Sequence, residues 1–425
     1  MKIKYLRSRT VTYITASVVY ILSVAIIFGG IYSIMRQTQA SGDNYTQNEA
    51  KNSKTANIRA VWIATVYNIN YPSRSGLSQK DLSGELDTII NNVISLGANT
   101  IFFQVRPCSD ALYKSDLFPQ SKYVSGTRGE AADGGFDSLL YLTEKAHEKN
   151  ISVHAWINPV RILTSTKEIP TLTSWEAATK HPEWTVEYGD GKLYYDIGIP
   201  YLRQYIADGV YEIVKNYSID GVVFDDYFYP YPTRDDDGNI CEFNDGDTYK
   251  KYGGKYSLED FRRMNVSALI RMCSAAAKKA DPDCLFGVSP CGIYKNTTYN
   301  GVEISGLQGY YDIYCDCISF AREGSVDYLA PQLYWSREDK NAPFLALLSY
   351  WKDSLRGTSA ALIPCLAPYR YEDSSYESGE ISEQLTISKS TVGNGSYALY
   401  GYNALIDPSL SVGDEVRRFF SLYDK

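Results

Sequence analysis

Two aspartates that directly follow a short apolar run are the residues in this sequence best suited to catalysis. Residues 220–232 read DGVVFDDYFYPYP, so Asp225 and Asp226 end the run 222–224 and precede a cluster of aromatic rings. A buried carboxylate is costly without partners, so a charged pair at the end of a core strand should open into a cleft. Two carboxyl groups can share the acid and base work of glycosidic-bond cleavage. The segment therefore favours a site that processes glycosides.

Polar side chains after other apolar runs extend this candidate site. Asp110 is predicted to join Asp225 and Asp226 in catalysis, with capping of its own turn as an equally weighted alternative. Amides could bond to sugar hydroxyls or to an acetamido group, and aromatic rings offer flat apolar faces to a sugar. The side chains predicted to bind substrate are Arg106, Asn158, Tyr227, Tyr229, Tyr294, Asn296, Gln332, Tyr334 and Trp335.

Strand geometry predicts different roles for the two neighbouring aspartates. Successive side chains on a strand point to opposite faces, so Val223 and Asp225 should share one face. Asp226 can reach the same cleft only if the strand has already ended. For one of the two aspartates, capping of the loop or a structural pairing with Arg106 or Arg161 is the alternative to a catalytic role.

The elements that must position these residues read as a (β/α)8 barrel. Apolar runs alternate with helical patterns from residue 58 onward, and the polar residues above follow the runs. In such a barrel the carboxyl ends of the strands form the catalytic face. An open doubly wound sheet is the alternative, but no run is followed by a glycine-rich dinucleotide or phosphate loop. The eight runs are residues 61–66, 100–105, 151–157, 221–225, 285–289, 327–333, 362–367 and 397–402.

Capping residues mark where the flanking helices should begin. Ser78 and Ser257 each stand before a helical pattern with an acidic residue three positions later. A third helix is expected to start near Pro200. These signals predict helices between the runs, as the barrel requires.

Composition and charge argue against nucleic acid and metal ions as partners. The chain has 425 residues and a net charge of −8, and it contains no basic stripe. Its three histidines are isolated, and the acidic run 235–239 lacks the final glutamate of a calcium loop. The eight cysteines have no metal-ligand spacing and are interpreted as buried free thiols, with disulfides as the alternative. We expect no cofactor and no metal, and the sequence leaves protein partners and oligomeric state open.

The N-terminal residues read as a membrane anchor followed by a tether. Residues 1–10 are basic and form a predicted cytoplasmic tail, whereas residues 11–35 contain no charge and are long enough to cross a bilayer. Residues 36–57 are polar and unpatterned, as in a flexible linker. We expect a single-pass signal anchor in the cell membrane with the barrel, residues 58–425, outside. A cleaved signal peptide, which would release a secreted protein, is the alternative.

The motifs at the ends of the runs, in this order, resemble the glycosyl hydrolase-like 10 family of exported bacterial proteins. The likeness covers residues 58–335 and departs where Cys291 and Tyr294-Lys295 replace an aromatic residue and Trp-Arg. The resemblance implies a TIM-like barrel and cleavage of peptidoglycan glycan strands, particularly strands stripped of peptide stems. The matching pieces are RAVW (59–62), FQVRP (103–107), DALY (110–113), HAWINP (154–159), FDDYFYP (224–230), SP (289–290), GI (292–293) and PQLYW (331–335).

These observations together predict a glycoside hydrolase that cleaves N-acetylated cell-wall glycan strands outside the membrane. The aspartate pair at the end of the fourth strand would carry the reaction. In one hypothesis, one aspartate orients the substrate acetamido group while the other protonates the leaving oxygen. The alternative is a non-catalytic protein that binds or scaffolds cell-wall glycan on a degenerate barrel.

Overall fold

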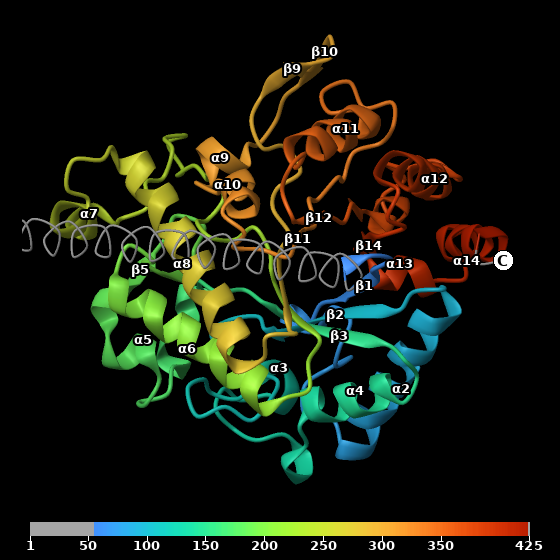
Figure 1. Cartoon of the computed structure of the whole chain (residues 1–425). Coiled ribbons are helices and arrows are strands. Elements are labelled where there is room, and N and C mark those ends of the chain that lie inside the picture. Colours follow the sequence, from blue (N-terminus) through green and yellow to red (C-terminus); the bar gives the residue numbers. More distant parts are fainter. Residues whose placement is uncertain (1–54, 424–425) are drawn as a thin grey trace, which may run out of the picture. The chain divides into compact units, whose positions relative to one another are not determined.

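One curled sheet of parallel strands forms the centre of the molecule (Figure 1). The structure is a computed structural model that describes residues 55–423. All neighbouring strands of this sheet run parallel. In sheet order they are β12 (Ala361–Leu362), β11 (Tyr328–Leu329), β8 (Leu285–Val288), β7 (Gly221–Phe224), β3 (Ser152–Ile157), β2 (Thr100–Arg106), β1 (Arg59–Ile63), β14 (Tyr397–Leu399) and β13 (Cys365–Leu366).

The two outermost strands of this order come from one stretch of chain. Only Ile363 and Pro364 separate β12 from β13. The Ile363 N–H donates to the Leu329 carbonyl oxygen at 2.9 Å, and the Ala398 N–H donates to the Pro364 carbonyl oxygen at 2.9 Å. The sheet therefore curls until its edges meet, in a TIM-like arrangement. The predicted α/β class is confirmed, and every predicted run contributes a strand, the seventh contributing both β12 and β13.

Helices cover the outside of the curled sheet (Figure 1), and the three helices whose starts the sequence predicts begin there. The Ser78 hydroxyl accepts the Asp81 N–H at the start of α2, and the Ser257 hydroxyl accepts the Asp260 N–H at the start of α8. Pro200 is the first residue of α6. The longer helices are α2 (Gln79–Ser95), α4 (Ser138–His147), α6 (Pro200–Asn216), α8 (Leu258–Ala280), α11 (Phe344–Ser354), α12 (Glu380–Val392) and α14 (Val412–Tyr423).

Shorter elements decorate the loops that join strands to helices. A three-stranded antiparallel sheet follows β3, and a β-hairpin follows β8. The short strands are β4 (Arg161–Leu163), β5 (Thr185–Glu187), β6 (Leu193–Tyr195), β9 (Thr297–Tyr299) and β10 (Val302–Ile304). The short α-helices are α3 (Lys122–Ser125), α5 (Ala177–Lys180), α7 (Gly246–Tyr252), α9 (Gly309–Asp312), α10 (Cys317–Arg322) and α13 (Tyr402–Ile406). Short 3₁₀ helices cover Val66–Asn68, Asp133–Gly135, Thr166–Thr171, Pro182–Trp184 and Pro368–Tyr371.

Two apolar layers hold this architecture together, one on each face of the sheet. The larger layer packs the sheet against the helices. The smaller layer fills the inside of the curl, and its buried members include Ala60, Trp62, Phe102, Trp156, Val223, Tyr328 and Ala398. Parallel strands are covered on both faces in such folds, which explains the continuously apolar runs in the sequence.

The predicted tail (1–10), membrane segment (11–35) and most of the linker (36–57) lie outside the described residues. Among residues 55–423, no helix combines the length and the apolar character needed to span a bilayer.

Candidate active site

The end of β7 places both aspartates at the carboxyl end of the curled sheet. Val223 points into the inner apolar layer, and β7 ends at Phe224. Asp225 therefore continues toward the inside, as the alternation of the strand predicts. Because the strand has ended, Asp226 reaches the same cavity, and only 5% and 1% of the two residues' surfaces are exposed.

The pair faces a pocket of about 270 Å³ with an aromatic lining. The indoles of Trp62 and Trp156 meet edge to face, with ring centroids 4.9 Å apart. The rings of Tyr227 and Tyr231 lie 5.0 Å apart, and those of Tyr334 and Tyr400 stack at 5.9 Å. The complete lining is Trp62, Trp156, Asp225, Asp226, Tyr227, Tyr231, Ser289, Gln332, Tyr334, Tyr369 and Tyr400. Such a pocket presents flat apolar faces around two carboxyl groups.

Nitrogen donors and a buried cation surround Asp225. Its Oδ2 atom accepts hydrogen bonds from the Trp156 indole N–H at 3.2 Å and from the Asn158 side-chain amide. Its Oδ1 atom accepts a longer bond of 3.3 Å from the Tyr227 backbone N–H. The buried Arg161 guanidinium lies near enough to lower the pKa of Asp225 by its charge. These contacts all favour the ionised carboxylate.

Asp226 has fewer partners than its neighbour. Its Oδ2 atom accepts a short hydrogen bond from the Tyr231 hydroxyl. Its buried Oδ1 atom makes no hydrogen bond with any residue that the structure describes. The Gln332 side chain is close enough to lower the pKa of Asp226, although no hydrogen bond of normal geometry joins the two. Asp226 is therefore less fully hydrogen-bonded than Asp225.

Burial makes both carboxyl groups hard to ionise. Loss of solvent raises the pKa of Asp225, and the adjacent Asp226 carboxylate raises it further. Burial also raises the pKa of Asp226, against the lowering effect of the Tyr231 hydroxyl. The pair consequently retains a proton above the usual pH range of aspartate, as an acid catalyst of glycoside cleavage requires.

Asp110 and Arg106 do not reach the pair. Asp110 is fully buried, where it accepts the Cys108 N–H at 2.8 Å and lies 3.9 Å from the Arg128 guanidinium. This placement matches the turn-capping alternative. The register of β2 shifts between Gln104 and Arg106, and the Arg106 guanidinium packs 3.8 Å from the centre of the Phe118 ring.

The other predicted binding residues divide between the pocket and the surrounding loops. Tyr227, Gln332 and Tyr334 line the pocket, and Asn158 contacts Asp225. The Tyr229 ring packs against Phe243 and Tyr314 instead. The remaining three belong to loop structure: Tyr294 donates to Asp316, Asn296 accepts the Gly306 N–H, and Trp335 packs against the core.

Five lining residues were not predicted from the sequence, whereas Tyr231 belongs to the aromatic cluster expected beside the acid pair. Trp62 and Trp156 lie inside apolar runs, where a tryptophan is indistinguishable from an ordinary core residue. Tyr400 directly follows β14, and Tyr369 comes three residues after the end of β13, so the rule that strand ends carry the site could have found them. The fifth is Ser289.

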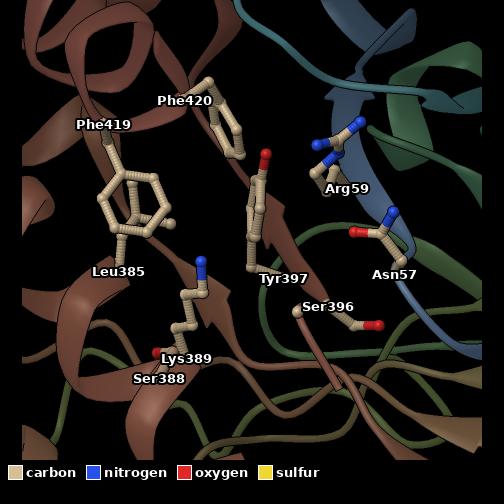
Figure 2. Close-up of a pocket in the computed structure, with 10 residues that line it drawn as sticks. Asn57, Arg59, Leu385, Ser388, Lys389, Ser396, Tyr397, Phe419 and Phe420 are labelled. Carbon is tan, nitrogen blue, oxygen red and sulfur yellow. The ribbon is translucent and has the colours of Figure 1, made fainter. Parts of the chain in front are cut away.

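A second pocket, of about 140 Å³, lies at the opposite end of the strands (Figure 2). β1 begins there at Arg59, and β14 begins there at Tyr397. The Tyr397 ring stacks on the Phe420 ring, with centroids 5.4 Å apart. No carboxylate stands among the described residues that line it. The acid pair therefore defines the candidate catalytic end of the molecule.

Comparison with known proteins matches the family expected from the motifs. The family model described as "Glycosyl hydrolase-like 10" matches residues 57–377. The glycosyl hydrolase YngK of Bacillus subtilis is 37% identical over 318 residues, which are 74% of this chain and 61% of that protein. The glycosyl hydrolase DigH of Escherichia coli K12 is 34% identical over 335 residues, which are 74% of this chain and 73% of that protein.

Solved structures share the fold at low sequence identity. The PgaB (BpsB) glycoside hydrolase domain of Bordetella bronchiseptica aligns with a TM-score of 0.51 and 13% identity, covering 85% of this chain and 98% of that one. Alpha-L-fucosidase isoenzyme 2 of Paenibacillus thiaminolyticus aligns with a TM-score of 0.50 and 12% identity, covering 86% and 49%. The match to YngK spans about three fifths of that relative's length.

Proposed function

Because the chain belongs to the glycosyl hydrolase-like 10 family, we propose that it hydrolyses glycosidic bonds with the pair Asp225 and Asp226. The observation that carries the proposal is a pair of buried carboxyl groups with raised pKa values in an aromatic pocket at the carboxyl end of a TIM-like sheet. That end of the sheet is where enzymes of this architecture hold their active sites. The aromatic walls suit the flat faces of sugar rings.

The acid pair can act in two complementary ways on an N-acetylated sugar. One carboxylic acid gives its proton to the leaving oxygen while the bond from that oxygen to the anomeric carbon breaks. The acetamido carbonyl oxygen of the substrate attacks the anomeric carbon as the bond breaks, and water later opens the resulting ring. The second aspartate, as a carboxylate, accepts the acetamido N–H and stabilises the positive charge that develops.

The proposed substrate is an N-acetylated glycan strand of the bacterial cell wall. The motif resemblance to the family supports peptidoglycan strands, above all those without peptide stems. We also propose that residues 11–35 anchor the chain in the cell membrane, with the barrel outside, because this segment is uncharged and follows a basic tail.

Release of new reducing ends from purified glycan strands tests this function. The full chain should cleave strands without peptide stems, whereas Asp225→Asn and Asp226→Asn should bind them and yield no product. Asp236→Asn is a matched control, because Asp236 is exposed in the loop after β7 and does not line the pocket. If the wild-type chain binds such strands and never cleaves them, the glycan-scaffold alternative replaces the enzyme.

De-N-acetylated strands provide the control for the acetamido mechanism. Without an acetamido carbonyl, the substrate cannot supply the attacking oxygen, so cleavage should be lost while other contacts stay. Equal cleavage of acetylated and de-N-acetylated strands would exclude this mechanism and leave a direct role for the carboxylate.

A further inference from the structure

Gln104 lies behind the acid pair and contacts neither aspartate. It belongs to β2 and is buried, with 1% of its surface exposed. Its Oε1 atom accepts hydrogen bonds from the Thr65 N–H at 2.8 Å and the Val66 N–H at 2.9 Å. Its Nε2 atom lies 2.6 Å from the Asn158 Oδ1 atom. Gln104 thus connects the backbone after β1 to a side chain that touches Asp225.

The backbone fixes the orientation of both amides in this chain of bonds. Backbone N–H groups can only donate, so the Gln104 oxygen must face Thr65 and Val66. Its NH₂ group must then face Asn158, whose oxygen accepts the bond. The Asn158 NH₂ group is consequently left to donate to Asp225 Oδ2. The backbone N–H groups of Thr65 and Val66 therefore set the direction of every hydrogen bond from Gln104 through Asn158 to Asp225.

We propose that Gln104 is a positioning residue that, through Asn158, holds Asp225 as the carboxylate of the pair and leaves the shared proton on Asp226. This inference rests on the proposed function, because it assigns Asp226 as the general acid and Asp225 as the group that orients the acetamido N–H. Gln104 itself touches no substrate. Its effect is to prevent the Asn158 amide from rotating and presenting its oxygen to Asp225.

The partners of the two aspartates agree with this assignment. Asp225 accepts bonds from the Trp156, Asn158 and Tyr227 nitrogen atoms and has the Arg161 cation nearby. Among the described residues Asp226 accepts one bond, from the Tyr231 hydroxyl, and the Gln332 side chain also favours its ionised form, so its partners are fewer than those of Asp225.

The charges around Asp225 come from several elements of the fold. Arg161 on β4 favours its ionised form, and Asp226 opposes it. The Tyr227 and Tyr400 hydroxyls also interact with its charge, and burial keeps both phenols neutral by raising their pKa values. The donors from Trp156 and Asn158 therefore add to the Arg161 cation, and the opposing charge of Asp226 is absent while Asp226 holds the proton. Of these donors, only the Asn158 amide could present an oxygen instead.

The test is Gln104→Glu, which keeps the shape of the side chain and replaces its donor with an acceptor. One carboxylate oxygen still faces Thr65 and Val66, so the other must accept a bond from the Asn158 NH₂ group. Asn158 then turns its oxygen toward Asp225, which can meet it only when protonated. We expect the acidic limb of the kcat/KM–pH profile on N-acetylated strands to move to higher pH by at least one unit. At a fixed pH on that limb, this shift is a tenfold loss of kcat/KM.

A double-mutant cycle with Asn158→Leu shows whether Gln104 acts through Asn158. Asn158→Leu removes a donor from Asp225 and should move the acidic limb in the same direction. Adding Gln104→Glu to Asn158→Leu should then move it no further. An equal additional shift would overturn the proposal, as would lower activity with an unchanged pH profile, the result expected of a purely structural role.

A measurement without substrate separates this proposal from the proposed function. Side-chain carboxyl ¹³C resonances of the full chain, assigned by their loss in Asp225→Asn and Asp226→Asn, report which aspartate loses its proton first. Asp225 should lose it first in the wild type, and the order should reverse in Gln104→Glu. The same order in both proteins would refute the role of Gln104 whether or not the chain cleaves glycans. Gln79→Glu, at the exposed start of α2, is the matched control for added charge.

Discussion

Replacing one aspartate of the buried pair with asparagine is expected to stabilise the fold near neutral pH. Asp226→Asn suits this test, because the asparagine oxygen can still accept the Tyr231 hydroxyl. Its NH₂ group then occupies the place of Oδ1, which has no hydrogen-bond partner among the described residues. The substitution removes a buried charge and also the repulsion that raises the pKa of Asp225.

The size and sign of this effect follow from proton linkage. Both aspartates have raised pKa values in the folded chain, so between about pH 4 and the raised values the native state binds more protons than the unfolded state. Stability of the wild type therefore falls as pH rises through this window. Each unit by which a pKa is raised costs about 1.4 kcal/mol above the window. We expect Asp226→Asn to gain about 1–3 kcal/mol at pH 8 and nothing below pH 4.

Urea unfolding of the full chain at pH 4 and pH 8 measures this difference directly. Asp236→Asn serves as the control, since that exposed carboxylate should leave the free energy of unfolding unchanged at both values. If Asp226→Asn destabilises the fold at pH 8, or stabilises it equally at both values, the carboxyl groups are not the costly buried pair described above.

Three further substitutions test the parts of the site separately. Tyr231→Phe removes the hydrogen bond from the Tyr231 hydroxyl to the Asp226 carboxylate, worth about 1.5–3 kcal/mol for a charged acceptor. The alkaline limb of the kcat–pH profile should therefore move to higher pH by about 1–2 units, and an unmoved limb would argue against Asp226 as the acid. Tyr400→Leu removes a ring stacked on Tyr334 and should raise KM about 3–10-fold with kcat little changed, whereas an unchanged KM would place the substrate elsewhere. Asp110→Ala should lower the free energy of unfolding by about 1–3 kcal/mol and leave kcat unaltered, and a loss of kcat would restore a catalytic role.

The acid pair could be located from the sequence because its signal is local. A charged pair after Val222–Phe224 conflicts with burial unless a cleft begins there, and β7 does end at Phe224. The run pattern likewise predicted the strands, since a parallel sheet covered on both faces demands continuous apolar segments. The features that could be predicted are those that depend on local sequence: the spacing of apolar residues and the burial of each strand.

Departures from regular geometry escaped prediction. Alternation along β2 would direct Arg106 to the same face as Gln104, but the register shift between them turns Arg106 outward onto Phe118. Gln104 in turn reads as an unremarkable polar residue, because its importance depends on the backbone of residues 65–66, far away in sequence. Tyr231 faces the pocket while Tyr229 packs into its loop, and no periodic pattern separates such neighbours after a strand has ended.

The most direct test of the central claim is cleavage of N-acetylated, peptide-free glycan strands in ¹⁸O-labelled water. Hydrolysis by Asp225 and Asp226 predicts one ¹⁸O atom at the anomeric carbon of each new reducing end, detected by mass spectrometry, and no product from Asp226→Asn. Strands that stay intact, or product ends that carry no ¹⁸O, would contradict the assignment of this pair as a glycoside-hydrolysing site.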